Sequence, residues 1–258
     1  MQIHILASGS TGNAVFVQMG ATKILIDAGI SNRRIEKGLA ELGVNISELA
    51  GILITHEHND HINGLDVMVR KYKIPVYTRG RTWERIGCAA NLPIECIKLI
   101  DDHFTVGDTE IEPFGISHDA ADPVGFCLYH QQKKIVIATD LGMVTPVIEK
   151  ALTGADLMVL ESNHDIDMLN NGPYPQFLKQ RIRSSKGHLS NWQAAQVLAR
   201  IPHKTGTRVM LAHLSQHNNH PALAEKTVRS VLHDAGLEVG QEIHLYPTYP
   251  ARTVSQVI

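Results

Sequence analysis

Short apolar runs and amphipathic stretches alternate along the first third of the chain. Five runs are apolar or alternate with period two, as strands do; they cover residues 3–7, 14–19, 23–27, 51–55 and 75–78. Residues 31–42 place Ile35, Leu39 and Leu42 on one helical face and are followed by Gly43, a common helix end. Residues 65–72 have the same helical character. The run at 51–55, GILIT, is apolar throughout and predicts a strand covered on both faces.

The remainder of the chain continues the alternation of strands and helices. Strands are expected over residues 104–114, as a hairpin turning at Gly107-Asp108, and over 126–129, 134–139, 157–160 and 208–212. Helices are expected over residues 175–184, 190–199 and 222–235, with Ser190 as the N-cap of the second. No linker-like, repeated or low-complexity segment interrupts this pattern. We therefore predict a single two-halved α/β domain over residues 1–258.

The composition is that of a folded protein without a membrane segment. Hydrophobic residues make up 43% of the chain, yet no apolar run reaches the roughly 18 residues that a transmembrane helix needs. The N-terminus has neither the basic start nor the long apolar stretch of a signal peptide. Cys88, Cys96 and Cys127 show no CxxC spacing, so we expect reduced thiols and a cytoplasmic location.

Charge and histidine content direct attention to local chemistry. The formal charge of −2 gives the molecule as a whole no attraction for nucleic acid, so such binding would need a local basic patch. The 15 histidines are dispersed along the chain. Dispersed histidines that the fold brings together are what a transition-metal site requires.

The strongest local signal is an HxHxDH cluster directly after the apolar run GILIT, formed by His56, His58, Asp60 and His61. Two histidines two positions apart can direct their imidazoles at one ion, and the adjacent aspartate and histidine can serve a second ion roughly 3.5–4 Å away. The start of the cluster, His56-Glu57, resembles HExxH, but Asp60 stands where that motif needs its second histidine. The cluster therefore predicts a dinuclear metal site.

Further metal-ligand types follow other predicted strands. His118 comes after the hairpin, Asp140 follows the run IVIAT, and His213 follows the run RVMLA. A single histidine or aspartate at a strand end is commonly a cap or a solvated group. Three of them in this order after HxHxDH indicate that they complete the metal site, because strand ends of α/β folds are where chemistry is placed.

This ordered set resembles the metallo-β-lactamase superfamily, from LIDAG near residue 25 to His213. The resemblance implies an α/β fold, a four-layer αββα sandwich with the metals at one edge. It implies one ion held by His56, His58 and His118, and a second held by Asp60, His61 and His213. Asp140 would bridge the two ions. Asp27, at the end of KILID, matches an aspartate that supports the metal loop without binding metal.

Three further segments are similar to one bacterial subgroup of that superfamily, the YycJ/WalJ type. They are LASGSTGN, LESNHD followed by NGPYP, and the pair KGHLSN and AHLSQHNN. This resemblance implies a nuclease-like phosphodiesterase, a 5′-to-3′ DNA exonuclease that uses a metal-bridging hydroxide as nucleophile. DNA is expected in preference to RNA. His164, within LESNHD, is expected to support the site structurally.

Phosphate chemistry also fits the residues themselves. Two divalent ions bring about four positive charges, while Asp60, Asp140 and a bridging hydroxide return about three negative ones, so the site attracts phosphate. We expect Asp60 and His188 to be catalytic, His188 as the proton donor to the leaving group.

The expected substrate contacts are small polar residues and a local basic stretch. They are Ser8, Ser10 and Asn13 of the SGSTGN loop, and Arg181, Arg183 and Lys186 immediately before His188. The segment RGRTWER adds Arg79, Arg81 and Arg85 around Trp83, an aromatic ring able to stack on a base.

Two other readings remain open at this stage. The same metals would serve a small-molecule thioesterase or lactonase, which would be insensitive to charge reversal at Arg181 and Arg183. A binding protein with structural metals is disfavoured, because structural sites are closed. We expect two divalent cations, zinc first, with manganese or iron as alternatives, because ligand type restricts the metal without fixing it. The oligomeric state is left open.

Overall fold

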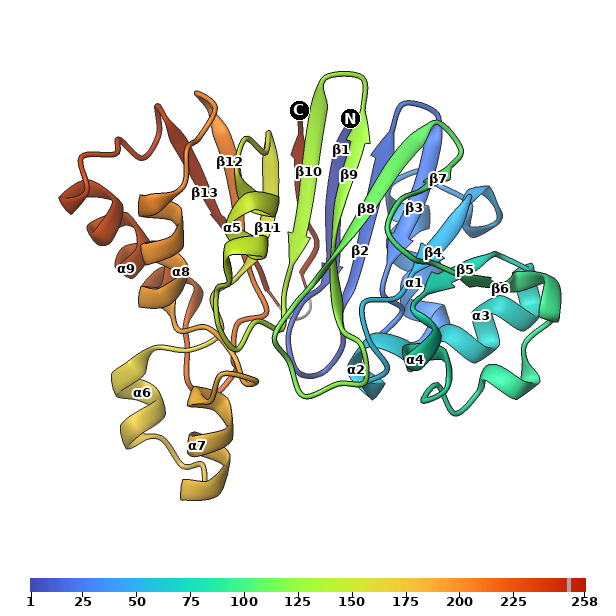
Figure 1. The fold of residues 1–258 in the computed structure, drawn as a ribbon, viewed down its shortest axis with the longest axis horizontal. Helices are drawn as coiled ribbons and strands as arrows, with labels where there is room; N and C mark the ends of the chain where they lie inside the picture. Colours follow the sequence, from blue (N-terminus) through green and yellow to red (C-terminus); the bar gives the residue numbers. More distant parts are fainter. Residues whose placement is uncertain (250–251) are drawn as a thin grey trace.

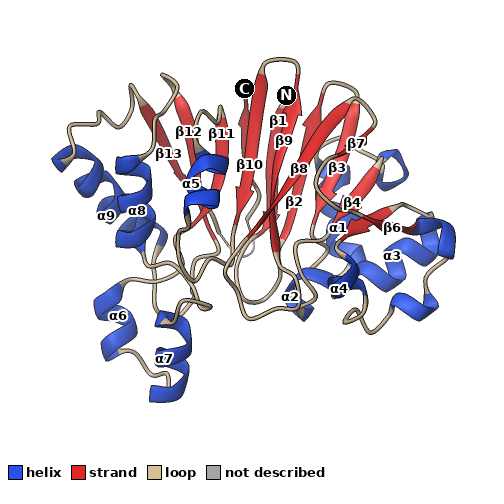
Figure 2. Ribbon diagram, viewed as in Figure 1, coloured by secondary structure: helices blue, strands red, loops and turns tan. Residues whose placement is uncertain are grey.

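The chain folds into two seven-stranded sheets that face each other, with helices on both outer faces (Figures 1 and 2). The computed structural model describes residues 1–249 and 252–258. The observed fold is the predicted αββα sandwich. Among the described residues, no helix is both long enough and apolar enough to cross a membrane.

The first sheet has the strand order β14-β1-β2-β3-β4-β5-β6. Its strands are β1 (Gln2–Ala7), β2 (Ala14–Met19), β3 (Thr22–Ile26), β4 (Gly51–Leu53), β5 (Val76–Thr78), β6 (Ile97–Leu99) and β14 (Val254–Val257). The second sheet has the order β13-β12-β11-β10-β9-β8-β7. Its strands are β7 (Phe104–Val106), β8 (Thr109–Gly115), β9 (Val124–His130), β10 (Lys133–Ala138), β11 (Leu157–Glu161), β12 (Thr207–Ala212) and β13 (Ile243–Pro247).

The helices lie outside the sheets, except for short ones at the lower edge. They are α1 (Asn32–Glu41), α2 (Asn59–Ile62), α3 (Leu65–Tyr72), α4 (Gly80–Trp83), α5 (Pro146–Leu152), α6 (Ile166–Asn171), α7 (Gln176–Arg183), α8 (Asn191–Arg200) and α9 (Pro221–Asp234). Short 3₁₀ turns cover Ile46–Glu48, Ala89–Asn91 and Ile94–Cys96. The predicted cap of α8 is confirmed, because Ser190 Oγ accepts from Gln193 N and Gln193 Oε1 accepts from Ser190 N.

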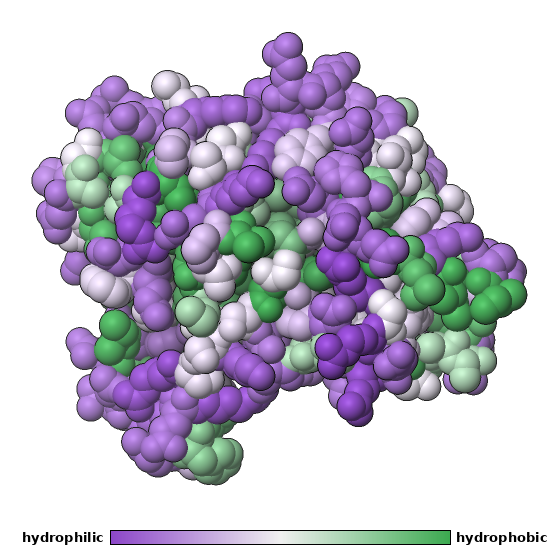
Figure 3. Space-filling model, viewed as in Figure 1, coloured by the Kyte–Doolittle hydropathy of each residue, from purple (hydrophilic) through white to green (hydrophobic). Residues whose placement is uncertain are grey.

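The alternation within the strands explains the layering. In β2, Val15 and Val17 point into the core between the two sheets, whereas Phe16 packs under the helices α1 and α3. A third core lies between the second sheet and the helices α5, α8 and α9. The predicted hairpin at Gly107-Asp108 is present, with Val106 paired to Thr109 across the turn. Hydrophilic residues cover most of the face in Figure 3.

Parallel strands bring the functional residues to one edge. Strands β3 to β6 pair in parallel, as do β10 to β13. The carboxyl ends of parallel strands lie at the same edge of a sheet, so the segments that follow β3, β4, β10, β11 and β12 converge at the lower edge in Figure 1.

Candidate metal centre

The predicted metal ligands come together at this edge, although they are spread over more than 150 residues of sequence. Among the described residues, four sets of side chains have their donor atoms within 4.8 Å of one another: His56, His58 and His118; Asp60, His61 and His213; His56, His61 and Asp140; and Asp140, Glu161, His188 and His213. The first two sets are those expected for the two ions. The third joins them through Asp140, the expected bridge.

The first set has the spacing of metal ligands. His56 Nε2 and His58 Nδ1 lie 3.1 Å apart. A tetrahedral zinc ion with Zn–N bonds of about 2.0–2.1 Å would hold two nitrogens roughly 3.3 Å apart. His56 Nδ1 donates to Thr55 Oγ1 at 3.0 Å, and His118 Nδ1 lies 3.4 Å from Gly187 O. These bonds leave Nε2 of both rings free for a cation.

The second set is organised around Asp27. The Asp27 carboxylate accepts from His61 Nδ1 at 2.7 Å and from Thr55 N at 2.9 Å. This bond fixes the His61 ring so that its Nε2 lies 3.4 Å from Asp140 Oδ2 and 3.5 Å from Asp60 Oδ2. Asp27 itself lies behind His61 and belongs to none of the ligand sets found in the described residues.

Unpaired buried atoms test whether the site suits cations. Asp140 Oδ2 and His213 Nε2 are buried and have no hydrogen-bond partner in the described part of the chain. An unpaired buried polar atom is costly, whereas a cation between the two sets would satisfy both. Burial, followed by repulsion from neighbouring histidines, lowers the pKa of His56 well below its usual value, so this ring is neutral as a ligand must be. The residues therefore fit divalent cations.

Backbone geometry is unusual at the ends of the strands that carry the site. Asp27, Asp140 and His213 adopt positive φ angles of 59°, 60° and 55°. This left-handed region is uncommon for residues other than glycine and costs about 1–3 kcal/mol at each such position. All three side chains contact the cluster: Asp27 and Asp140 contact His61, and His213 contacts Asp140.

Glu161 is a site residue that the sequence interpretation did not assign. It ends β11 and is fully buried. One carboxylate oxygen accepts from His188 Nδ1 at 2.9 Å and from His213 Nδ1 at 2.8 Å, while the other accepts from Leu141 N and Leu189 N. We interpret Glu161 as a positioning residue, because its oxygens are already occupied by four donors. Its place at the end of an apolar strand, like that of Asp140, was the available sequence signal.

A buried amide network holds the segments behind Glu161. Asn219 Nδ2 donates to Ser162 O, and Asn191 and Ser162 are joined through Asn191 Oδ1. Asn163 Nδ2 donates to His213 O at 2.8 Å. His164 is also buried here; its backbone carbonyl accepts from Asn191 N. This network explains why LESNHD, KGHLSN and AHLSQHNN occur together, since each supplies part of it.

Two residues of the SGSTGN loop, Ser8 and Asn13, form hydrogen bonds with the cluster itself. Ser8 is buried, and its hydroxyl accepts from His213 N at 2.7 Å, so Ser8 positions one of the expected ligands. Asn13 is buried as well, with Nδ2 3.3 Å from Asp60 Oδ2 and 3.1 Å from His61 Nε2. Ser10 is exposed at the tip of the loop.

The basic residues that were expected to contact the substrate lie at different places relative to the cluster. Arg181 forms a 2.7 Å ion pair with Asp119, the neighbour of His118, and so lies beside the cluster. Arg183 instead donates to Asn170 Oδ1 of α6, and Lys186 is exposed in the loop before His188. The interpretation of Trp83 as a stacking ring is wrong: the ring is buried and its indole nitrogen donates to Lys98 O.

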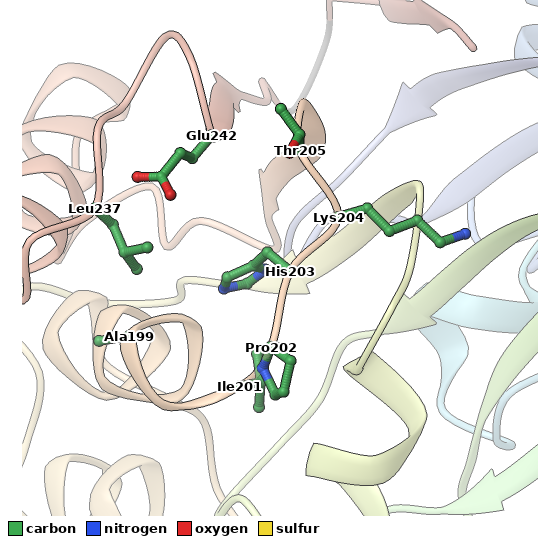
Figure 4. Close-up of a pocket in the computed structure, with 8 residues that line it drawn as sticks. All are labelled: Ala199, Ile201, Pro202, His203, Lys204, Thr205, Leu237 and Glu242. Atoms are coloured by element: carbon green, nitrogen blue, oxygen red, sulfur yellow. The ribbon is translucent and has the colours of Figure 1, made fainter.

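One cavity lies next to the cluster, and another lies away from it. A cavity of about 460 Å³ has five charged lining residues, Glu57, Arg81, Glu84, Arg85 and Asp119, and it adjoins the expected ligands His56, His58 and His118 in sequence. Another, of about 200 Å³, is shown in Figure 4 and lies before the first residue of β12. His213 follows the other end of that strand, roughly 20 Å away at 3.3 Å per residue. The cavity in Figure 4 is therefore separate from the metal centre.

The protonation of His213 predicts how cation binding responds to pH. Burial alone lowers the pKa of His213, but the Asp140 and Glu161 carboxylates outweigh it and raise the pKa to about 9. A cation must displace this proton, so its affinity should increase as pH rises toward 9, by up to about tenfold per pH unit for each proton displaced. Calorimetric titration with Zn²⁺ at pH 6, 7 and 8 measures this. Equal affinity at all three values would contradict the assignment of His213 as a ligand.

Comparison with known proteins places the chain in a family. Residues 22–214 match the model of the beta-lactamase superfamily domain. The exodeoxyribonuclease YycJ of Bacillus anthracis is 40% identical over 97% of this chain and 96% of its own length. The exodeoxyribonuclease WalJ of Streptococcus pneumoniae is 38% identical over 95% and 93%. The metallo-β-lactamase fold protein YhfI of Bacillus subtilis superimposes with a TM-score of 0.74 at 15% identity, covering 98% of both chains. The chain thus belongs to the metallo-β-lactamase superfamily of metal-dependent hydrolases, in its YycJ/WalJ-type subgroup.

Proposed function

We propose that this protein is a two-metal phosphodiesterase that removes nucleotides from DNA ends in the 5′-to-3′ direction. The observation that carries the proposal is the pair of ligand sets joined by Asp140. The names of the relatives, both exodeoxyribonucleases matched over almost their whole length, support DNA as the substrate. The free thiols of the three cysteines agree with the cytoplasmic setting expected of such an enzyme.

The ligand set favours an anionic substrate. Asp60 and Asp140 bring two negative charges to the cluster, and the remaining ligands, five histidines, bind metal as neutral rings. Two bound divalent cations would leave the site net positive, stabilise charge on the phosphate oxygens and lower the pKa of an attacking water. Asp60, half-buried beside His61, faces the same set of donors.

His188 is positioned to handle the proton of the leaving group. Glu161 holds its Nδ1 at 2.9 Å, which fixes the ring and leaves Nε2 to exchange a proton with the substrate. The ring lies 5.3 Å from His118 and 5.1 Å from His213, measured between ring centroids, and therefore stands against both ligand sets. His188 is only half-buried, so a substrate can reach it.

Exposed arginines beside the cluster can contact the phosphates of a polynucleotide. Arg81 and Arg85 are exposed and line the 460 Å³ cavity together with the carboxylates of Glu57, Glu84 and Asp119. The charge of Asp119 is offset by its ion pair with Arg181. We propose that phosphates of the strand approach through these arginines.

The proposal is tested with 5′-phosphorylated duplex DNA and purified protein in the presence of Mn²⁺ or Zn²⁺. Wild-type protein should release nucleotides progressively from the 5′ end. His58→Ala, which removes one ligand of the first set, should reduce the rate at least about a hundredfold, because an incomplete metal site loses transition-state stabilisation. Labels at the 5′ and 3′ ends distinguish the direction of cleavage.

A thioester and a lactone, assayed in parallel, separate this proposal from a small-molecule hydrolase. Turnover of either one at higher kcat/KM than DNA, insensitive to competing DNA, would contradict the proposal. Equal DNA cleavage by wild type and His58→Ala would indicate a contaminating nuclease and would also contradict it.

A further inference from the structure

The helices α6 and α7 form an arm that starts and ends at the metal centre. Residues 165–187 follow β11, and the chain comes back to the end of that strand at His188, whose Nδ1 donates to Glu161. The two ends of the arm are joined by a bridge between His164 and Ser190 and by the bond from Asn163 N to Leu189 O. In Figure 1 the arm projects below the sheets at the edge where the strands that carry the ligands end.

The arm is held rigidly. Lys179 Nζ and Arg183 of α7 both donate to Asn170 of α6 at 2.8 Å, through its backbone and side-chain oxygens respectively. On its other flank the arm is bonded to the segment that carries His118, through the Arg181–Asp119 ion pair and through Ser117 Oγ, which donates to Ser185 O at 2.6 Å. An element fixed on both flanks can present a side chain at a defined place.

One face of α7 carries an exposed aromatic ring toward this edge. Lys179 and Ile182 are the buried positions of the helix. Phe177 and Arg181 are four positions apart, so they share a different face, and Arg181 fixes that face toward Asp119 and the metal centre. The Phe177 ring is 73% exposed, compared with 49% for Trp192, the other large exposed aromatic in the described residues. Phe177 is therefore accessible to a ligand that approaches along this face of α7.

We infer that Phe177 is a stacking platform for a base of the single strand whose phosphate lies at the metal centre. The inference rests on the proposed function. Bases of any sequence stack on an aromatic ring, which suits an enzyme that degrades a strand progressively. The ring stands about one helical turn, roughly 6 Å, beyond Arg181, and successive nucleotides of an extended strand are spaced on this scale. The exposed phenylalanine thus takes the stacking role that the buried Trp83 cannot have.

The test compares two substrates in the metal-loaded protein, a single-stranded oligonucleotide and bis(p-nitrophenyl) phosphate, a small diester with no further nucleotides to extend along α7. Phe177→Ala should lower the ratio of their kcat/KM values by roughly tenfold, the effect of losing one stacked base, through a higher KM for the oligonucleotide. Phe177→Trp should restore the ratio, and its added fluorescence should be quenched by the oligonucleotide. Leu99→Ala is the matched control, because Leu99 is 70% exposed on β6, at the far end of the other sheet.

Several outcomes would overturn the inference. An unchanged ratio in Phe177→Ala, or an equal fall in Leu99→Ala, would mean that Phe177 does not contact the strand. A change in sedimentation of Phe177→Ala without a change in the ratio would show that Phe177 covers a contact between copies of the chain. Wild-type protein that cleaves neither DNA nor the small diester would overturn the proposed function as well, so the two failures are distinguishable.

Discussion

Replacing Asp140 by asparagine is expected to reduce DNA hydrolysis by about a thousandfold and to remove at least one cation from the protein. Asp140 is 2% exposed and lies among His61, His118 and His213, with one oxygen unpaired. Asparagine keeps the shape but loses the charge that would be shared by two cations. Losing roughly 4 kcal/mol of transition-state stabilisation corresponds to this factor. Elemental analysis and nucleotide release from 5′-phosphorylated DNA measure both effects.

A matched control lies at the opposite end of the neighbouring strand. Asp156 precedes β11 and is paired with Lys133 and Lys204 at 3.0 and 2.7 Å, so Asp156→Asn also removes a carboxylate from this sheet. It should leave the metal content unchanged. If Asp140→Asn keeps two cations per chain and the rate of the control, Asp140 is not the bridging ligand.

Replacing Gly29 by alanine is expected to destabilise the protein by about 3 kcal/mol or more and to disrupt the metal loop. A Cβ atom at Gly29 would lie 1.6 Å from Asp60 O and 2.6 Å from Asn13 N. These are backbone atoms that hold the loops together, since Asn13 N donates to Asp60 O and Gly29 N to Asn13 O. The chain must therefore shift, at a cost at or above the usual range for overpacking. Urea denaturation measures the loss of stability.

Gly87→Ala provides the control for this substitution. A Cβ atom at Gly87 would have no neighbouring atom within 4 Å, and Gly87 has no left-handed φ, so alanine should be tolerated within about 0.5 kcal/mol. Equal stability and equal zinc affinity of Gly29→Ala and Gly87→Ala would show that the close approach of Gly29 to Asp60 is unimportant.

The fold was predictable where the buried positions of a helix or strand recur at a regular spacing along the sequence. The predicted helices 31–42, 65–72, 175–184 and 190–199 match α1, α3, α7 and α8 within a few residues, because each has a single apolar face. Elements without such a signal were missed. Strand β6 is three residues long and largely exposed at a sheet edge, and β14 alternates between half-buried and exposed positions, so neither carries an apolar run.

The site was predictable for a related reason. Each expected ligand follows a strand. Parallel pairing brings most of these strand ends to one edge, and β8, which precedes His118, ends at the same edge because β9 runs antiparallel to both β8 and β10. A role that a residue acquires by contacting another residue far along the chain could not be predicted. Glu161 acquires its role from two histidines far along the chain, and Ser8 from the backbone of His213. Trp83 was misinterpreted because sequence alone does not distinguish a buried ring from an exposed one in a basic segment.

The central claim is that two cations held by the joined ligand sets hydrolyse DNA. Its most direct test is to titrate metal-depleted protein with Mn²⁺ or Zn²⁺ while following nucleotide release from 5′-phosphorylated duplex DNA. We expect hydrolysis to rise mainly with the second equivalent of cation and to reach a plateau at two per chain, because Asp140 joins two complete sets of donors. Full activity at one equivalent, or two bound equivalents without any DNA cleavage, would contradict it.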